Sequence, residues 1–287
     1  MSKNYVILMD VSGDIDPAVV AAEDIGFLPM EYSLGGEMRT CSAPESRDTL
    51  KLFYDGQRKG DLTQTSQISP YLYETYLKPY MEAGQSVLYF CLSSGLSSTY
   101  QSALMAKESL KEEYPEVDFY PVDTLAATGG MGLLAERALR NRRAGMSLED
   151  NYEDVSKAAK TIRHWFMVSD LMYLKRGGRI SGASAVLGTA LNITPILQIN
   201  PQGKLDTIAK KRGTKAALKY LISQFASTCD MSTGDVVYIV DADAADLADT
   251  LEAEVKKLYP DALVRRAGLS PIIGAHTGPG MAAIIHM

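Results

Sequence analysis

The stretch that most constrains the fold is Val87–Ala103, which has the sequence VLYFCLSSGLSSTYQSA. Its first five residues are apolar, as is typical of a strand that is buried on both faces of a sheet. The hydroxyl-rich segment Ser93–Thr99 follows, and Tyr100–Leu110 is predicted to be a helix. The first N–H groups of a helix are unpaired and its dipole is positive there, so this junction is a candidate anion site. The alternative is that the serines only cap the helix and fill the turn.

Strand-like and helix-like segments alternate along the chain, which predicts an α/β fold. Between residues 4 and 162, apolar runs such as Tyr5–Met9 and Val117–Val122 are separated by helical segments. This order is typical of a mainly parallel sheet that is covered on both faces. A new strand is expected to begin at His164. We therefore predict two α/β domains, residues 1–163 and 164–287, each a mainly parallel sheet flanked by helices.

The overall composition excludes several classes of protein. The chain has 287 residues, of which 46% are hydrophobic and 22% charged, as in ordinary globular proteins. The net charge of −6 and the lack of a long Lys/Arg cluster argue against nucleic-acid binding. The three cysteines are far apart and form no disulfide framework. No stretch is long enough to span a membrane, and Val6–Met9 is too short for a signal peptide. We expect a cytoplasmic protein without stable membrane insertion.

Two further segments carry candidate binding residues. Thr65 and Ser66 precede a helix that begins at Pro70. Ser69 is the natural cap of that helix, so Thr65 and Ser66 are not needed to cap it. His276 lies in the segment HTGPG, where Gly-Pro-Gly fixes a turn and allows close backbone approach. The alternative for His276 is a surface turn that merely contains a histidine.

A glycine-flanked arginine is another candidate. Arg179 follows Gly177-Gly178, and a tight turn there would present the guanidinium. The alternative is a helix C-cap with a solvated charge. His164, next to two aromatic residues, is interpreted as a packing residue.

Several catalytic signatures are missing from the sequence. Ser93–Ser98 is not in a G-x-S-x-G elbow, and there is no Walker loop and no G-x-G-x-x-G. There is no HExxH, and three scattered histidines do not form an ordinary zinc site. We therefore predict no catalytic residues, no metal site and no cofactor.

Taken together, these segments resemble the DegV family, the bacterial fatty-acid-binding proteins that serve as binding subunits of fatty acid kinase. The matching segments occur in the family's order over nearly the whole chain. They are TSQIS at 65–69, SSGLSSTYQSA at 93–103, VDTLAATGGMG at 122–132, YLKRGGRISGASAVLGTALNITPIL at 173–197 and HTGPG at 276–280.

The resemblance implies a long-chain fatty acid bound between the two domains, with its carboxylate at the domain interface and its acyl chain buried. The residues that match the family's carboxylate loops are Thr65, Ser66, Ser94, Ser97 and His276. Which of Ser93, Ser94 and Ser97 contacts the carboxylate is left open.

The resemblance also implies a role without catalysis. The protein would present the fatty acid to the catalytic subunit of a fatty acid kinase, which forms the acyl-phosphate. Arg179 is the candidate contact with that partner. Two other functions are compatible with the residues: a serine-nucleophile lipid hydrolase or acyltransferase with His276 as base, and a binder of another small anion at the same helix N-terminus.

Overall fold

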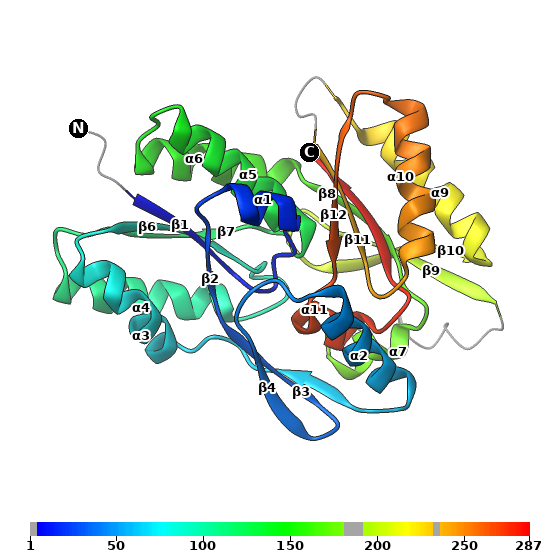
Figure 1. Ribbon diagram of the computed structural model, residues 1–287, viewed down its shortest axis with the longest axis horizontal. Helices are drawn as coiled ribbons and strands as arrows, with labels where there is room; N and C mark the ends of the chain where they lie inside the picture. The colour runs from blue at the N-terminus through cyan, green and yellow to red at the C-terminus, as the bar shows by residue number, and fades with distance from the viewer. Residues whose placement is uncertain (1–4, 181–191, 232–235) are drawn as a thin grey trace.

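The N-terminal half contains a four-stranded parallel sheet. The computed structural model describes residues 5–180, 192–231 and 236–287 (Figure 1). The strands of this N-terminal sheet occur in the order β2-β1-β6-β7, and all their pairings are parallel. They are β1 (Tyr5–Asp10), β2 (Gly26–Leu28), β6 (Ser86–Cys91) and β7 (Phe119–Asp123). The predicted parallel sheet is confirmed.

Helices cover both faces of the N-terminal sheet, with α3 and α4 on one face and α5 and α6 on the other (Figure 1). The helices of this half are α1 (Pro17–Ala22), α3 (Pro70–Glu82), α4 (Thr99–Glu113), α5 (Gly129–Arg143) and α6 (Leu148–Ala158), followed by a 3-10 turn at Ala159–Thr161. Every residue of β6 is buried, because an apolar strand in a doubly covered sheet has no solvent face.

A small antiparallel sheet projects from this half, next to α2 (Arg47–Arg58) (Figure 1). It contains β3 (Met30–Leu34), β4 (Glu37–Cys41) and β5 (Thr63–Thr65). Gly35 and Gly36 join β3 to β4 with φ of 60° and 86°. A two-residue hairpin turn of this kind favours glycine because both residues have positive φ.

The C-terminal sheet has six strands in the order β10-β9-β8-β13-β11-β12. Its strands are β8 (Arg163–Met167), β9 (Ile193–Ile199), β10 (Leu205–Arg212), β11 (Val236–Asp241), β12 (Leu263–Gly268) and β13 (Ala282–His286), and its helices are α7 (Leu171–Arg176), α9 (Thr214–Thr228), α10 (Ala245–Leu258) and α11 (Pro271–Thr277). The predicted domain boundary between residues 163 and 164 falls at the start of β8.

The expectation that this second sheet is mainly parallel is wrong. Only β11 and β12 pair in parallel, whereas the other four pairings are antiparallel. One cause is β10, which was not predicted: it is half-exposed and ends in the basic residues Lys210–Arg212, so its apolar pattern is weak. It forms a hairpin with β9. The other cause is β13, which inserts between β8 and β11, and the apolar pattern of a strand does not encode its direction.

The C-terminal sheet is covered on both faces by different parts of the molecule. Phe166 belongs to the core shared with the N-terminal sheet, whereas its neighbours Trp165 and Met167 belong to a core under α9 and α10. This alternation follows from the two-residue period of a strand. One face of the C-terminal sheet therefore packs against the N-terminal half of the chain.

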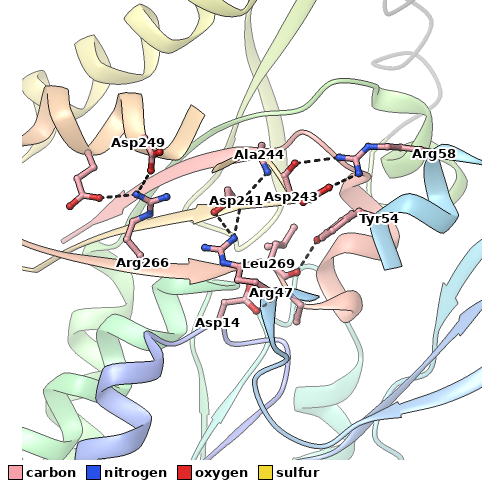
Figure 2. A network of polar contacts seen from close by, with 12 residues as sticks. Asp14, Arg47, Tyr54, Arg58, Asp241, Asp243, Ala244, Asp249, Arg266 and Leu269 are labelled. Carbon is pink, nitrogen blue, oxygen red and sulfur yellow. Dashed lines mark hydrogen bonds and ion pairs between the residues drawn. The ribbon is translucent and has the colours of Figure 1, made fainter. Parts of the chain in front are cut away.

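Helix α2 is fixed to the C-terminal part by polar contacts (Figure 2). Arg47 Nη1 lies 2.8 and 3.0 Å from the two carboxylate oxygens of Asp241, which is fully buried. Tyr54 Oη donates to the carbonyl of Leu269 at 2.8 Å. Because α11 directly follows Leu269 and Ser270, these contacts set the position of α11.

A second set of polar contacts connects α5 to the C-terminal sheet. Tyr238 Oη donates to Glu136 Oε1 at 2.6 Å, and Arg265 forms an ion pair with the same carboxylate at 2.9 Å. A Cβ atom on Gly129 would lie 2.7 Å from the side chain of Tyr238. Glycine is needed there because the helix and the tyrosine are in close contact.

We expect Tyr54→Phe to lower the free energy of unfolding by about 1–3 kcal/mol, because the variant leaves a buried carbonyl without its donor. Chemical denaturation with a fluorescence readout measures this change. Tyr71→Phe is the matched control: Tyr71 is 73% exposed whereas Tyr54 is fully buried, so the control should change stability by less than about 0.5 kcal/mol. Equal effects of the two substitutions would contradict the docking role of Tyr54.

Candidate functional site

A cavity of about 520 Å³ lies between the carboxyl ends of the N-terminal strands and the inner face of the C-terminal sheet. This volume is in the range of roughly 300–1,000 Å³ that is usual for ligand sites. Most of its wall is apolar and includes Leu92, Phe166, Ile199, Ile272, Ala283 and Ile285. The cavity also borders all six predicted site residues, namely Thr65, Ser66, Ser94, Ser97, Arg179 and His276. They come from four separate segments, which only the tertiary fold brings together.

The hydroxyls of the turn between β6 and α4 have different partners. Ser93 Oγ donates to the carbonyl of Gly203 at 2.8 Å and is fully buried. Ser97 Oγ accepts from the backbone N–H of Thr99 at 3.2 Å, so this serine stabilises the start of α4. Ser94 Oγ has no hydrogen-bond partner in the described residues, although its N–H donates to Asp123. Ser98 also borders the cavity and its side chain makes no capping bond, so Ser94 and Ser98 are both free to bind a ligand, and Ser94 is the one of them that was predicted as a site residue.

His276 lies at the end of α11, in contact with β5. Its Nε2 is 2.8 Å from Thr65 Oγ1, and its Nδ1 has no partner among the described residues. A Cβ atom on Gly177 would lie 2.2 Å from Nδ1, so a side chain at residue 177 would displace the imidazole. Burial and, secondarily, the charge of Arg179 lower the pKa of His276 to about 4. The imidazole is therefore neutral at physiological pH.

Arg179 lies on the same side of the cavity as the β6–α4 turn. Its Nε donates to the carbonyl of Leu96 at 3.1 Å, and its Nη1 donates to the carbonyl of Gly177. Burial lowers the pKa of its guanidinium, but an arginine stays charged in proteins. No carboxylate in the described part of the chain forms an ion pair with it. Arg179, which was expected to contact a partner, thus also places a positive charge beside the polar side chains of the cavity.

The electrostatics of the cavity favour an anion. Its lining contains Arg179 and two histidines but no Asp or Glu. The N-terminus of α4, which has 15 residues, also borders it. An anionic group at this end would meet hydroxyls, an imidazole and a guanidinium, while an apolar group would fit the rest of the wall.

Sequence analysis did not assign to the site several polar residues that line the cavity, among them His164 and Thr128. His164 was interpreted as a packing residue, but it lines the cavity together with Thr128. His164 Nε2 lies 3.2 Å from the carbonyl of Ala127, and burial lowers the pKa of His164 to about 4. The position of His164 in a strand, two residues before Phe166, would have placed it on the same face as Phe166.

The resemblance includes residues 181–191 of the 173–197 segment, and these lie outside the described residues. In the part of the chain that is described, no group of three or more His, Cys, Asp or Glu is arranged to hold a metal ion. Within the same ranges, no helix combines the length and the apolarity needed to cross a bilayer.

A family model supports the resemblance over almost the full length. The model described as "Uncharacterised protein, DegV family" matches residues 4–287. The chain belongs to the DegV family. A DegV domain-containing protein of Clostridium perfringens is 34% identical over 287 residues, which are 99% of this chain and 98% of that protein.

Solved structures have the same fold as this DegV chain. One is a Thermotoga maritima protein whose structure is described as revealing a fatty acid binding function. It has a TM-score of 0.84 and 26% identity, with 99% of each chain covered. Another is the Streptococcus pneumoniae fatty acid kinase B3 protein loaded with linoleic acid, with a TM-score of 0.84, 17% identity and 99% coverage of each chain. At that identity, the second likeness shows the fold alone.

We expect protonation of His276 to destabilise the protein. An unfolded histidine titrates near pH 6.5 and the folded one at about 4, so between these values the unfolded state binds more protons. The contribution of His276 to stability is therefore complete above about pH 6.5 and is lost as the pH falls toward 4. His276→Gln should remove this part of the pH dependence, measured as the slope of the unfolding free energy against pH. Identical slopes for the wild type and the variant would show that the imidazole is not held neutral.

Proposed function

We propose that this protein binds a long-chain fatty acid, with its carboxylate at Thr65, Ser94 and His276 and its acyl chain in the cavity between the two sheets. One observation carries the proposal: the same cavity has a polar end, with no Asp or Glu in its lining, and an apolar wall. The fatty acid binding function described for the Thermotoga maritima protein supports the same assignment.

The apolar wall can supply the binding energy. Burial of a methylene contributes about 0.8 kcal/mol, so a chain of roughly fifteen methylenes contributes about 12 kcal/mol before costs. Association costs roughly 4–15 kcal/mol. The acyl chain must therefore be almost completely buried, which is possible only in a deep cavity between layers of the fold and not on a surface groove.

The polar end can hold the carboxylate. A hydrogen bond to a charged group contributes roughly 1.5–3 kcal/mol. Ser94 Oγ is free in the described structure, and the hydroxyl of Thr65 is next to His276. The neutral imidazole of His276 has one N–H, and when Nε2 donates it to Thr65 Oγ1, the hydroxyl hydrogen of Thr65 is left to donate to the carboxylate. Arg179 adds a positive charge nearby. The sequence analysis had assigned Arg179 to contact with a partner and not to binding of the carboxylate.

We further propose that the protein is a binding subunit without catalysis of its own. A serine hydrolase needs a base hydrogen-bonded to the nucleophile. Here Ser93 is bonded to the carbonyl of Gly203, while the partner of His276 is Thr65. No carboxylate of the described chain orients the second nitrogen of His276. These contacts give no activated serine.

The partner in this proposal is the catalytic subunit of a fatty acid kinase, which would phosphorylate the presented carboxylate with ATP. The position of Arg179 supports this: besides the cavity, it borders an outer depression lined by Gly95, Gly178, Asn200 and Lys204. A partner docked there would reach the polar end of the cavity. Since ATP is the co-substrate, the proposal also places both proteins in the cytoplasm.

Fatty acid should be found in the purified protein by organic extraction and mass spectrometry, and the delipidated protein should be stabilised against heat by oleate or palmitate. Thr65→Val and Ser94→Ala should each weaken fatty-acid binding by about tenfold or more, because each removes a hydrogen bond to a charged group. Thr75→Val is the matched control, since Thr75 is exposed on α3 and bonds only to the carbonyl of Tyr71.

Three results would contradict the fatty-acid proposal. Absence of extractable fatty acid together with no thermal shift would exclude it. Labelling of a serine by a fluorophosphonate probe, with turnover of nitrophenyl esters, would favour the hydrolase. Stabilisation by phosphate compounds but not by fatty acids would favour a binder of small anions.

Arg179→Met should separate presentation from binding. The variant should retain fatty-acid binding within about tenfold, because the acyl chain supplies most of the energy, but it should lose acyl-phosphate formation when mixed with a fatty acid kinase and ATP. The measurement is acyl-phosphate trapped as the hydroxamate. Full phosphorylation with the variant would show that this guanidinium is not needed for presentation.

A further inference from the structure

The last turn of α2 is bonded to both segments that carry the Thr65–His276 pair. Gln57 is buried there, with only 3% of its surface exposed. Its Nε2 donates to Thr63 Oγ1 at 3.1 Å and to the carbonyl of Gly274 at 3.0 Å. Thr63 belongs to β5, as does Thr65, and Gly274 belongs to α11, as does His276. One side chain outside the cavity thus connects the two elements.

The hydroxyl of Thr63 adds a second link between β5 and α11. It donates to the carbonyl of Ala275 at 3.0 Å. In a continuing helix this carbonyl would accept from the N–H four residues later, but that residue is Pro279, which has no N–H. The last carbonyls of a helix need partners from outside the helix. Thr63 therefore supplies a hydrogen bond that the end of α11 cannot make by itself.

The direction of these hydrogen bonds is fixed by the groups involved. A carbonyl oxygen can only accept, so Gln57 must turn its amide nitrogen, and not its oxygen, toward Gly274. The hydroxyl hydrogen of Thr63 is used on Ala275, so Thr63 Oγ1 accepts from Gln57. Gln57 Oε1 has no partner among the described residues. The amide N–H groups of Gln57 are therefore what connects β5 to α11.

The Thr65–His276 contact lies directly beside this link. Thr63 and Thr65 are two residues apart in β5, so their side chains point to the same side of the strand. Ala275 and His276 are successive residues of α11. The distance from His276 Nε2 to Thr65 Oγ1 is 2.8 Å. A shift of α11 relative to β5 by roughly 1 Å would break this hydrogen bond.

We infer that Gln57 is a positioning residue for the polar end of the cavity. It holds α11 against β5, so that His276 stays hydrogen-bonded to Thr65 and the hydroxyl hydrogen of Thr65 is directed to the carboxylate. Gln57 is not part of the cavity lining and acts only through this pair. The inference rests on the proposed fatty-acid binding and adds a residue, outside the cavity, that determines how the carboxylate is held.

Gln57→Met tests this role, because methionine has a similar length and no hydrogen-bond donor. The affinity of the delipidated protein for oleate is measured by displacement of a fluorescent fatty acid. It should fall about three- to tenfold, as the weakening of one hydrogen bond to a charged group predicts. Gln101→Met is the matched control, because Gln101 is exposed on α4, and it should bind oleate like the wild type.

A double-mutant cycle with Thr65→Val separates positioning from a general loss of structure. If Gln57 acts through Thr65, Gln57→Met should have less than about a twofold effect on oleate affinity in the Thr65→Val background. A general loss of structure would weaken binding by the same factor in both backgrounds. Equal factors would therefore contradict the inference, and so would an unchanged affinity of the single variant.

Substitutions of Thr63 test the same link even if Gln57→Met does not fold, because Thr63 is only half-buried. Thr63→Ser retains the hydroxyl and should bind oleate like the wild type. Thr63→Val should weaken binding about three- to tenfold, and this loss should again disappear in the Thr65→Val background. Equal affinities of Thr63→Ser and Thr63→Val would show that the link is not needed.

The same measurements distinguish this inference from the proposed function. If the wild type binds oleate and the Gln57 and Thr63 variants bind it equally well, the positioning role is wrong while fatty-acid binding stands. If the wild type does not bind oleate, the proposed function itself fails.

Discussion

The candidate site depends on the contact between the β6–α4 turn and the β9–β10 turn. Ser93 donates to the carbonyl of Gly203, and a Cβ atom on Gly95 would lie 2.6 Å from the backbone of Gly203. This close approach joins the carboxyl end of the N-terminal sheet to the edge of the C-terminal sheet. The hydroxyl-rich turn thus has three tasks: Ser93 holds the two parts together, Ser97 stabilises the start of α4, and Ser94 remains available to a ligand.

The polar end of the cavity combines neutral groups with a single positive charge. A neutral imidazole and hydroxyls bind a carboxylate less strongly than a cluster of arginines would, and weaker binding is what the proposed transfer of a ligand to a partner requires. Arg179 is tied to the carbonyls of Leu96 and Gly177, so its charge is held at the border between the cavity and the surface. Burial lowers the pKa of both His276 and His164 to about 4, so both imidazoles of the cavity wall are neutral at physiological pH.

The parts of the fold that were predictable are those with a local cause. The apolar run at Val87–Cys91 is a doubly buried strand, and Ser69 caps α3 by accepting from the backbone N–H of Leu72. The direction of the C-terminal strands and the existence of β10 have no such local cause, since pairing direction is set by neighbours that are distant in the chain. The place of His164 in the cavity wall was missed for a similar reason: a histidine followed by two aromatic residues has the same sequence context whether it packs in a core or borders a cavity.

The sequence by itself determined the α/β class, the position of the hydroxyl-rich turn before α4 and the residues that match the DegV segments. Each of these depends on residue types at short spacing. The tertiary structure decided which of these residues meet. Thr65 and His276 are 211 residues apart and come within 2.8 Å only because α2 fixes α11 against β5. Only packing between the two sheets leaves the cavity open and places His164 and Thr128 in its wall, because long-range contacts depend on the whole fold and not on local sequence.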